Sequence, residues 1–183
     1  MKKLSLTDFA KYRYPSALEL SPDGRYLTFA LKDVDKEGDG YRWNLWLYDL
    51  ESRESRQITR GDDQRKAVWE DNTHILYKTT ELDEALRARG FEEEWTVYHR
   101  LNVCTGEDRE AFRLPMSVSG LWKMDEGRYV FTGETHLDRP NLLELTGEAL
   151  EKELVRRQQT KGYKVLTELP LCENGVGMFN QTR

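Results

Sequence analysis

The side chains that could act as nucleophiles or bases lack the sequence patterns that catalysis requires. Seven serines are present, at positions 5, 16, 21, 52, 55, 117 and 119. None stands in the Gly-x-Ser-x-Gly frame, in which a strained turn between a strand and a helix exposes a hydrolase nucleophile. The histidines His74, His99 and His136 are 25 and 37 residues apart, without the short spacings of metal-binding pairs. We therefore expect no catalytic residue and no metal site in this sequence.

Other residues with chemical potential have simpler interpretations. Cys104 and Cys172 do not form a Cys-x-x-Cys pair, so we expect two ordinary buried or half-buried thiols. The run at 175–180 has Asn180 where a dinucleotide-binding loop has its third glycine, and we expect a turn there. Acidic runs at 62–63 and 92–94 are expected to be solvated loop charge, because adjacency in sequence does not bring two carboxylates to one bond. No cofactor is predicted.

The composition is that of a globular, mildly acidic protein. Its 183 residues include 28 Lys and Arg against 33 Asp and Glu, which gives a formal net charge of −5. This balance argues against a nucleic-acid partner, because such proteins carry a basic surface. No apolar run approaches the roughly 18 residues of a membrane-spanning helix, and charges precede any signal-like apolar stretch at the amino terminus. We expect no membrane partner and a cytoplasmic location.

Short alternating apolar runs predict β-structure. Runs at 17–20 and 25–31 flank the sequence Ser-Pro-Asp-Gly at 21–24. Because proline presets one turn dihedral and glycine accepts a positive φ, these segments predict a β-hairpin. Runs at 45–50 and 56–59 follow, so that four strands are expected within one short stretch.

The same order of runs then returns. A second set lies at 67–69, 74–78, 95–101 and 110–114, and a third begins at 118–122 and 128–132. The tripeptide Gly-Arg-Tyr occurs at both 24–26 and 127–129. Aligning Gly24 with Asn72 and Gly127 gives steps of 48 and 55 residues, near the roughly 40 to 50 residues of a four-stranded propeller blade.

These repeats predict an all-β chain, a partial β-propeller of about two and a half four-stranded antiparallel blades with short helical insertions. The expected parts are a lead-in segment at 1–15, a first blade at 16–62, a second blade at 63–115 and an incomplete third blade at 116–183. Helix-forming residues at 81–89 and near 143–160 predict the insertions. The five tryptophans are expected to pack on sheet faces or between blades. Because a closed propeller has at least four blades, we expect the chain to be part of a larger protein.

Three segments together carry a resemblance to a known family. They are Ser-Pro-Asp-Gly-Arg-Tyr-Leu-Thr-Phe at 21–29, Asn-Leu-Trp-Leu-Tyr-Asp-Leu at 44–50 and Arg-Gln-Ile-Thr-Arg-Gly at 56–61. Their order resembles the opening blade of the prolyl oligopeptidase family of serine peptidases, most of all its acylaminoacyl-peptidase and dipeptidyl-peptidase-like branch. Segments 98–107 and 166–175 are similar to later blades there.

The resemblance implies a division of labour within a larger protein. An amino-terminal propeller would restrict the access of peptide substrates to a carboxy-terminal α/β-hydrolase domain, which holds the catalytic triad and is absent from this sequence. This chain would then be inactive alone. Family members often hold the substrate's amino terminus with propeller carboxylates, and Glu168 is the candidate here. The oligomeric state is left open. Two alternatives remain: a non-catalytic propeller used as a protein-interaction scaffold, and a self-contained small β-domain that binds a ligand, which fits the repeat spacing less well.

Overall fold

The computed structural model describes residues 8–35, 40–61, 63–125, 127–135, 139–160, 171–173 and 177–179. Within these ranges the chain is mostly β, and its two largest sheets are antiparallel with four strands each. The chain divides into two compact units, Met1–Leu137 and Asp138–Arg183, which are described separately below.

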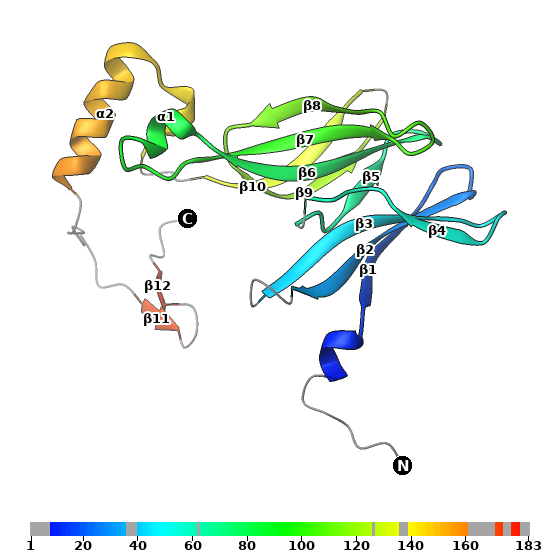
Figure 1. Ribbon diagram of the computed structural model, residues 1–183. Helices are drawn as coiled ribbons and strands as arrows, with labels where there is room; N and C mark the ends of the chain where they lie inside the picture. The colour runs from blue at the N-terminus through cyan, green and yellow to red at the C-terminus, as the bar shows by residue number, and fades with distance from the viewer. Residues whose placement is uncertain are drawn as a thin grey trace. The chain divides into compact units, whose positions relative to one another are not determined.

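The first sheet is a meander whose four strands pair in chain order (Figure 1). Its strands are β1 (Tyr14–Leu20), β2 (Tyr26–Asp35), β3 (Gly40–Asp49) and β4 (Glu54–Gln57), preceded by a short 3-10 helix, η1 (Asp8–Lys11). All three pairings are antiparallel. We call this sheet 1.

The hairpin that the sequence predicts at 21–24 is confirmed. Gly24 has a φ of 75° and donates its backbone N–H to the carbonyl of Ser21 at 2.9 Å. The Ser21 hydroxyl accepts a hydrogen bond from the backbone N–H of Tyr26 at 2.9 Å and donates to Asp23 at 2.6 Å. The side chains of the turn therefore fix the start of β2 against the end of β1.

The second sheet repeats this arrangement and carries the first predicted helix in a shorter form. Its strands are β5 (Ala67–Trp69), β6 (His74–Leu82), β7 (Glu94–Asn102) and β8 (Asp108–Leu114), again paired antiparallel in chain order. Helix α1 (Glu84–Arg87) covers only part of the predicted stretch 81–89, because Glu81 and Leu82 still pair with β7. Asp83 ends the strand and caps the helix by accepting the backbone N–H of Leu86 at 3.0 Å. We call this sheet 2.

A two-stranded hairpin follows sheet 2. Strands β9 (Ser117–Lys123) and β10 (Tyr129–Glu134) pair antiparallel around a turn in which Gly127 has a φ of 74°. Gly120 has a different role, because a Cβ there would lie 2.4 Å from the indole of Trp122. The absence of a side chain at Gly120 lets that indole lie along its own strand.

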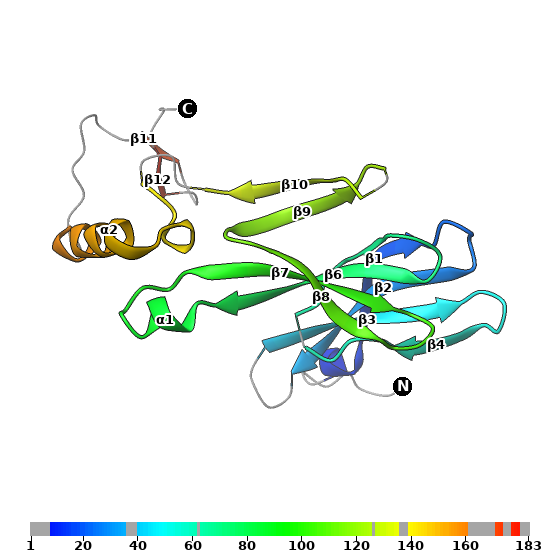
Figure 2. The ribbon, with the colours of Figure 1, turned by 90° about the horizontal axis from the view of Figure 1, so that it is seen from above.

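Sheet 2 lies between the other two β-layers (Figures 1 and 2). One of its faces packs on sheet 1 through a buried cluster. That cluster consists of Ala30, Leu45 and Leu47 from sheet 1 and Ala67, Trp69, Ile75, Tyr77, Leu101 and Val103 from sheet 2 and the turn that follows β7. The other face packs on the hairpin, with Leu76 and Tyr98 against Val118 and Leu121. Both faces of sheet 2 are therefore covered with apolar side chains.

The outward faces of the two flanking layers are also apolar but stay partly exposed. On sheet 1, Leu20, Leu27 and Tyr48 form one row across three strands, and Leu20 is 54% exposed. On the hairpin, Trp122 and Val130 are direct cross-strand partners, 48% and 49% exposed. The stack thus presents an apolar sheet face at each of its two ends.

The second unit holds the other predicted helix. It consists of η2 (Leu142–Glu144), α2 (Gly147–Gln159) and a short antiparallel pair, β11 (Leu171–Glu173) and β12 (Gly177–Phe179). Helix α2 agrees with the insertion predicted near 143–160. Its Leu154 is fully buried, and Glu153 accepts hydrogen bonds from Arg156 at 2.6 Å and Arg157 at 3.0 Å. Of the segment 166–175, which resembles a later blade, the structure describes only residues 171–173, which form β11.

Two details of the sequence interpretation change. Cys104 is exposed, not buried or half-buried, because it lies in the turn between β7 and β8. The backbone N–H of Cys104 donates a hydrogen bond to the Asn102 side chain in that turn. Trp43 lies within β3, since that strand begins at Gly40. The tryptophans at 46, 69, 95 and 122 lie in β3, β5, β7 and β9, as the alternating pattern predicts.

The contrast between Leu45 and Leu18 tests where the core lies. Leu45 is completely buried between sheets 1 and 2, whereas Leu18 on β1 is 59% exposed. We expect Leu45→Ala to lower the free energy of unfolding by about 2–5 kcal/mol, as cavity-forming core substitutions do. Leu18→Ala is the matched control and should change it far less. Urea denaturation at low protein concentration measures both, and equal losses would contradict this packing.

Candidate functional site

The residues singled out from the sequence do not form a catalytic group in the described part of the chain. Glu168, the predicted contact for a peptide amino terminus, lies outside the described residues. His74 belongs to a turn, in which Asp71 accepts backbone N–H groups from Thr73 at 2.7 Å and His74 at 2.8 Å. Burial opposes ionisation of Asp71, but these bonds and the His74 side chain outweigh it and lower its pKa to about 2. Asp71 and His74 therefore shape the β5–β6 turn.

The other two histidines offer no alternative centre. His99 lies on β7 with Nδ1 3.5 Å from Asp108 and its ring stacked on Tyr77. His136 lies outside the described residues. No set of three His, Cys, Asp or Glu side chains within the described ranges is arranged to hold a metal ion.

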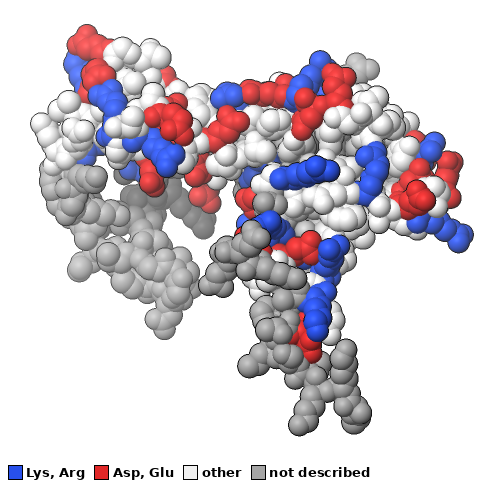
Figure 3. All heavy atoms as spheres, viewed as in Figure 1, with Lys and Arg blue, Asp and Glu red and all other residues white. Residues whose placement is uncertain are grey.

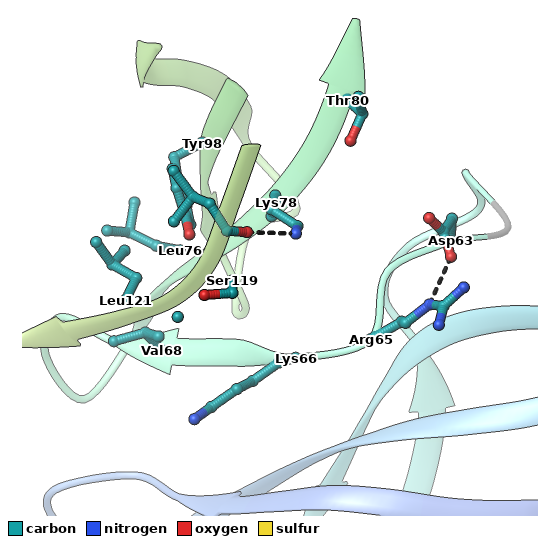
Figure 4. Close-up of a pocket in the computed structure, with 12 residues that line it drawn as sticks. Asp63, Arg65, Lys66, Val68, Leu76, Lys78, Thr80, Tyr98, Ser119 and Leu121 are labelled. Atoms are coloured by element: carbon teal, nitrogen blue, oxygen red, sulfur yellow. Dashed lines mark hydrogen bonds and ion pairs between the residues drawn. The ribbon is translucent and has the colours of Figure 1, made fainter. Parts of the chain in front are cut away.

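A pocket of about 290 Å³ opens between sheet 2 and β9, and we call it the β5–β9 pocket (Figure 4). Its apolar wall consists of Val68, Leu76, Tyr98 and Leu121, and its polar wall contains Asp63, Arg65, Lys66, Lys78 and Thr80. The lining comes from the segment before β5, from β5, β6 and β7, and from β9. Three side chains of the lining are cationic and one is a carboxylate.

Lys78 holds the start of β9 at this pocket. Leu76, Lys78 and Thr80 alternate along β6, so they point to the same face of sheet 2. The Lys78 ammonium donates a hydrogen bond to the Val118 carbonyl at 2.7 Å (Figure 4). Val118 in turn donates its N–H to the Thr96 hydroxyl at 3.2 Å. The register between sheet 2 and the hairpin is therefore set partly by side chains that reach a backbone.

The two other cations have carboxylate partners. Arg65 lies 2.7 Å from Asp63, and its guanidinium stacks 4.1 Å from the ring centre of Trp43 on β3. Lys66 lies 3.6 Å from Glu19 on β1. The segment before β5 is thus tied to sheet 1, and its charges are partly neutralised.

A second polar cluster ties sheet 2 to the hairpin without forming a pocket. The Glu70 side chain, 8% exposed, receives two hydrogen bonds from Arg100 and one from the Tyr129 hydroxyl, and its backbone carbonyl accepts from Lys123. Burial opposes ionisation of Glu70, but the bonds from Arg100 and Tyr129 prevail and lower its pKa. Burial, with the bond to Glu70, raises the pKa of Tyr129 to about 12. At neutral pH Glu70 therefore stays ionised and Tyr129 stays protonated, so the hydrogen bond between them persists.

The β5–β9 pocket is therefore the candidate site in the described part of the chain, and its lining holds more cationic side chains than carboxylates. Burial raises the pKa of Tyr98 to about 12, so its hydroxyl stays protonated at neutral pH. Elsewhere the charge is mixed: on the face of the molecule in Figure 3, Lys and Arg alternate with Asp and Glu without a broad patch of one sign. No helix in the described ranges is long and apolar enough to span a membrane.

Sequence reasoning missed this pocket, although one signal was present. Lys78 follows Leu76 at the two-residue spacing that puts both on one strand face. A lysine aligned with the buried positions of a strand indicates a cation turned toward the interior. The partners of Lys78 could not be read in the same way, because Val118 is 40 residues away.

The sequence matches no protein-family model and no curated protein.

The Glu70 cluster predicts an acid-dependent stability. Because the pKa of Glu70 in the folded state lies below its ordinary value of 4.5, its contribution to stability is complete above that pH and is lost as the pH falls through the folded-state pKa. We expect Glu70→Gln to be less stable at neutral pH and to lose less stability on acidification than the unchanged chain. Urea midpoints measured at a series of pH values give both quantities.

The exposed pair Asp125–Arg128 in the β9–β10 turn supplies the control. Asp125→Asn should change stability little at neutral pH, since exposed ion pairs contribute little. An unchanged acid dependence in Glu70→Gln would show that ionisation of Glu70 does not contribute to stability.

Proposed function

We propose that this chain is the amino-terminal β-propeller part of a serine peptidase that resembles the prolyl oligopeptidase family. In this role it gates the access of peptides to an α/β-hydrolase domain elsewhere in the parent protein. The gating part carries no catalytic group of its own. Its partners are the hydrolase domain and the peptide substrates.

One observation above all supports a propeller. The first strands of successive β-units lie next to each other, β1 beside β5 and β5 beside β9. The Trp69 indole on β5 donates to the Glu19 carbonyl on β1 at 3.1 Å. Four-stranded sheets arranged around a central channel bring equivalent strands together in this way. Chain-order meanders and near-equal spacing of the units agree with the same arrangement.

The apolar ends of the stack give a physical reason for further sheets. The rows of Leu20, Leu27 and Tyr48 on sheet 1 and of Trp122 and Val130 on the hairpin resemble the inner faces already covered by sheet 2. Apolar area that stays in water forgoes about 25 cal/mol per Å². In a closed ring, a neighbouring blade would cover each face, and no open sheet edge would remain at the junction.

The peptidase assignment follows from the family resemblance of segments 21–29, 44–50 and 56–61. The physical role of the ring is exclusion: its narrow channel admits short, unfolded peptides and excludes folded proteins. Sheets stiffened by the Glu70 and Lys78 contacts suit such a filter, because a filter selects by size only if its walls hold their shape.

The decisive experiment uses the parent protein. Translation of the gene downstream of Arg183 should give Gly-x-Ser-x-Gly followed by Asp and then His, and the purified parent should hydrolyse short peptides but not a folded protein. Replacing the serine of that motif with alanine should abolish hydrolysis. Further blades without a hydrolase motif would contradict the peptidase and favour the interaction scaffold instead.

A second prediction concerns the self-association of the isolated chain. Because two apolar faces are exposed, it should self-associate as its concentration rises in sedimentation velocity. Val130→Glu places a charge on the hairpin face and should shift the association to higher concentration. Ser52→Glu, in the exposed β3–β4 turn, adds the same charge away from either face and should have little effect. A sharp monomer at every concentration with cooperative unfolding would contradict the open faces.

A further inference from the structure

We infer that the β5–β9 pocket binds a carboxylate attached to a short apolar group. The pocket is built entirely from residues 63–121, so the inference requires no further blade and does not rest on the proposed peptidase. The pocket offers the ammonium of Lys78 to the carboxylate of such a ligand and an apolar wall to its apolar group.

The charged end of the ligand is matched by Lys78. Lys78 is half-buried as a residue, and it lines the pocket together with buried Leu76, Tyr98 and Leu121. An ammonium has three N–H donors, and Lys78 directs one to the Val118 carbonyl. Among the described residues, no carboxylate forms an ion pair with it, unlike Arg65 and Lys66. A bound carboxylate would supply the missing counter-charge at a site where charge pairing is stronger than in water.

The apolar end is matched by the opposite wall. Val68, Leu76 and Leu121 contribute branched side chains, and Tyr98 presents a ring that is 4% exposed. The volume of about 290 Å³ lies just below the range of about 300–1,000 Å³ that is typical of small-molecule sites. The pocket therefore suits a ligand of one side chain's size.

The same geometry favours a carboxylate over a phosphate. Guanidinium forks bind both phosphate and carboxylate in a bidentate way, and clusters of backbone N–H groups often add to a phosphate site. Here the guanidinium of Arg65 is held by Asp63 and stacked on Trp43, and the approach is half apolar. Lys78, the one lining cation without a carboxylate partner among the described residues, lies beside the apolar wall and so matches a monoanion with a tail.

Two sources can supply this chemistry, the carboxy terminus of a peptide and a free short-chain acid. N-acetyl-leucine represents the first and 4-methylpentanoate the second. Isothermal titration of the chain with each should detect binding that weakens as salt is added. Tighter binding of N-acetyl-leucine would assign the site to peptide carboxy termini, and tighter binding of 4-methylpentanoate to free acids, and either supports the inference.

Variants locate the binding in the pocket. Lys78→Met keeps the apolar stem and should weaken binding at least tenfold, whereas Lys152→Met, on an exposed lysine of α2, should leave it within twofold. Thr80→Glu provides a second variant if Lys78→Met fails to fold. Thr80 is exposed at the pocket rim on the face of Lys78, so its replacement supplies an internal carboxylate and should also abolish binding.

Three binding results would each overturn the inference, and so would the result with the variants that is given last. They are the absence of binding by both acids, equal binding of the uncharged N-acetyl-leucinamide, and tighter binding of inorganic phosphate than of either acid. Unchanged affinity in a folded Lys78→Met or Thr80→Glu variant would place the ligand elsewhere and reject the pocket.

Discussion

A sheet with two apolar faces must be covered on both sides, and this requirement organises the described β-layers. Sheet 2 satisfies it by packing one face on sheet 1 and the other on the β9–β10 hairpin. Hydrogen bonds then fix how the layers align. The Trp69 indole donates to a backbone carbonyl of β1, and Lys78 donates to a backbone carbonyl of β9. Glu70 accepts hydrogen bonds from Arg100 on sheet 2 and from Tyr129 on the hairpin. Apolar burial is non-directional, so these directional bonds are what select one register among many.

The local parts of the fold could be predicted from the sequence because their causes are local. The hairpin at 21–24 forms since proline, aspartate and glycine occupy the positions that its turn demands, and alternation along β3 and β6 marks the buried residues. Helix α1 is shorter than the predicted stretch 81–89, because pairing with β7 overrides the helix propensity of Glu81 and Leu82. The pairing of one strand with a distant strand cannot be predicted from the sequence of a single segment.

The candidate site could not be predicted for the same reason. Lys78 reaches Val118 across 40 residues, and Glu70 reaches Tyr129 across 59. Such contacts depend on how the β-layers stack on each other. A repeat in the sequence indicates that similar β-units follow one another, but it does not indicate which side chains meet between them. The one residue chosen from family resemblance, Glu168, lies outside the described residues. The sequence therefore indicated the architecture more fully than the chemistry within it.

The proposed propeller requires that further sheets of a parent protein cover the two apolar ends of the stack. Cysteine labelling at position 122 measures this directly, in a background where Cys104 and Cys172 are serine. We expect the thiol of Trp122→Cys to react rapidly in the isolated chain, because position 122 is 48% exposed there. In the parent protein a neighbouring sheet should protect it. Equal reactivity in both proteins would contradict a neighbouring sheet on this face and, with it, the propeller.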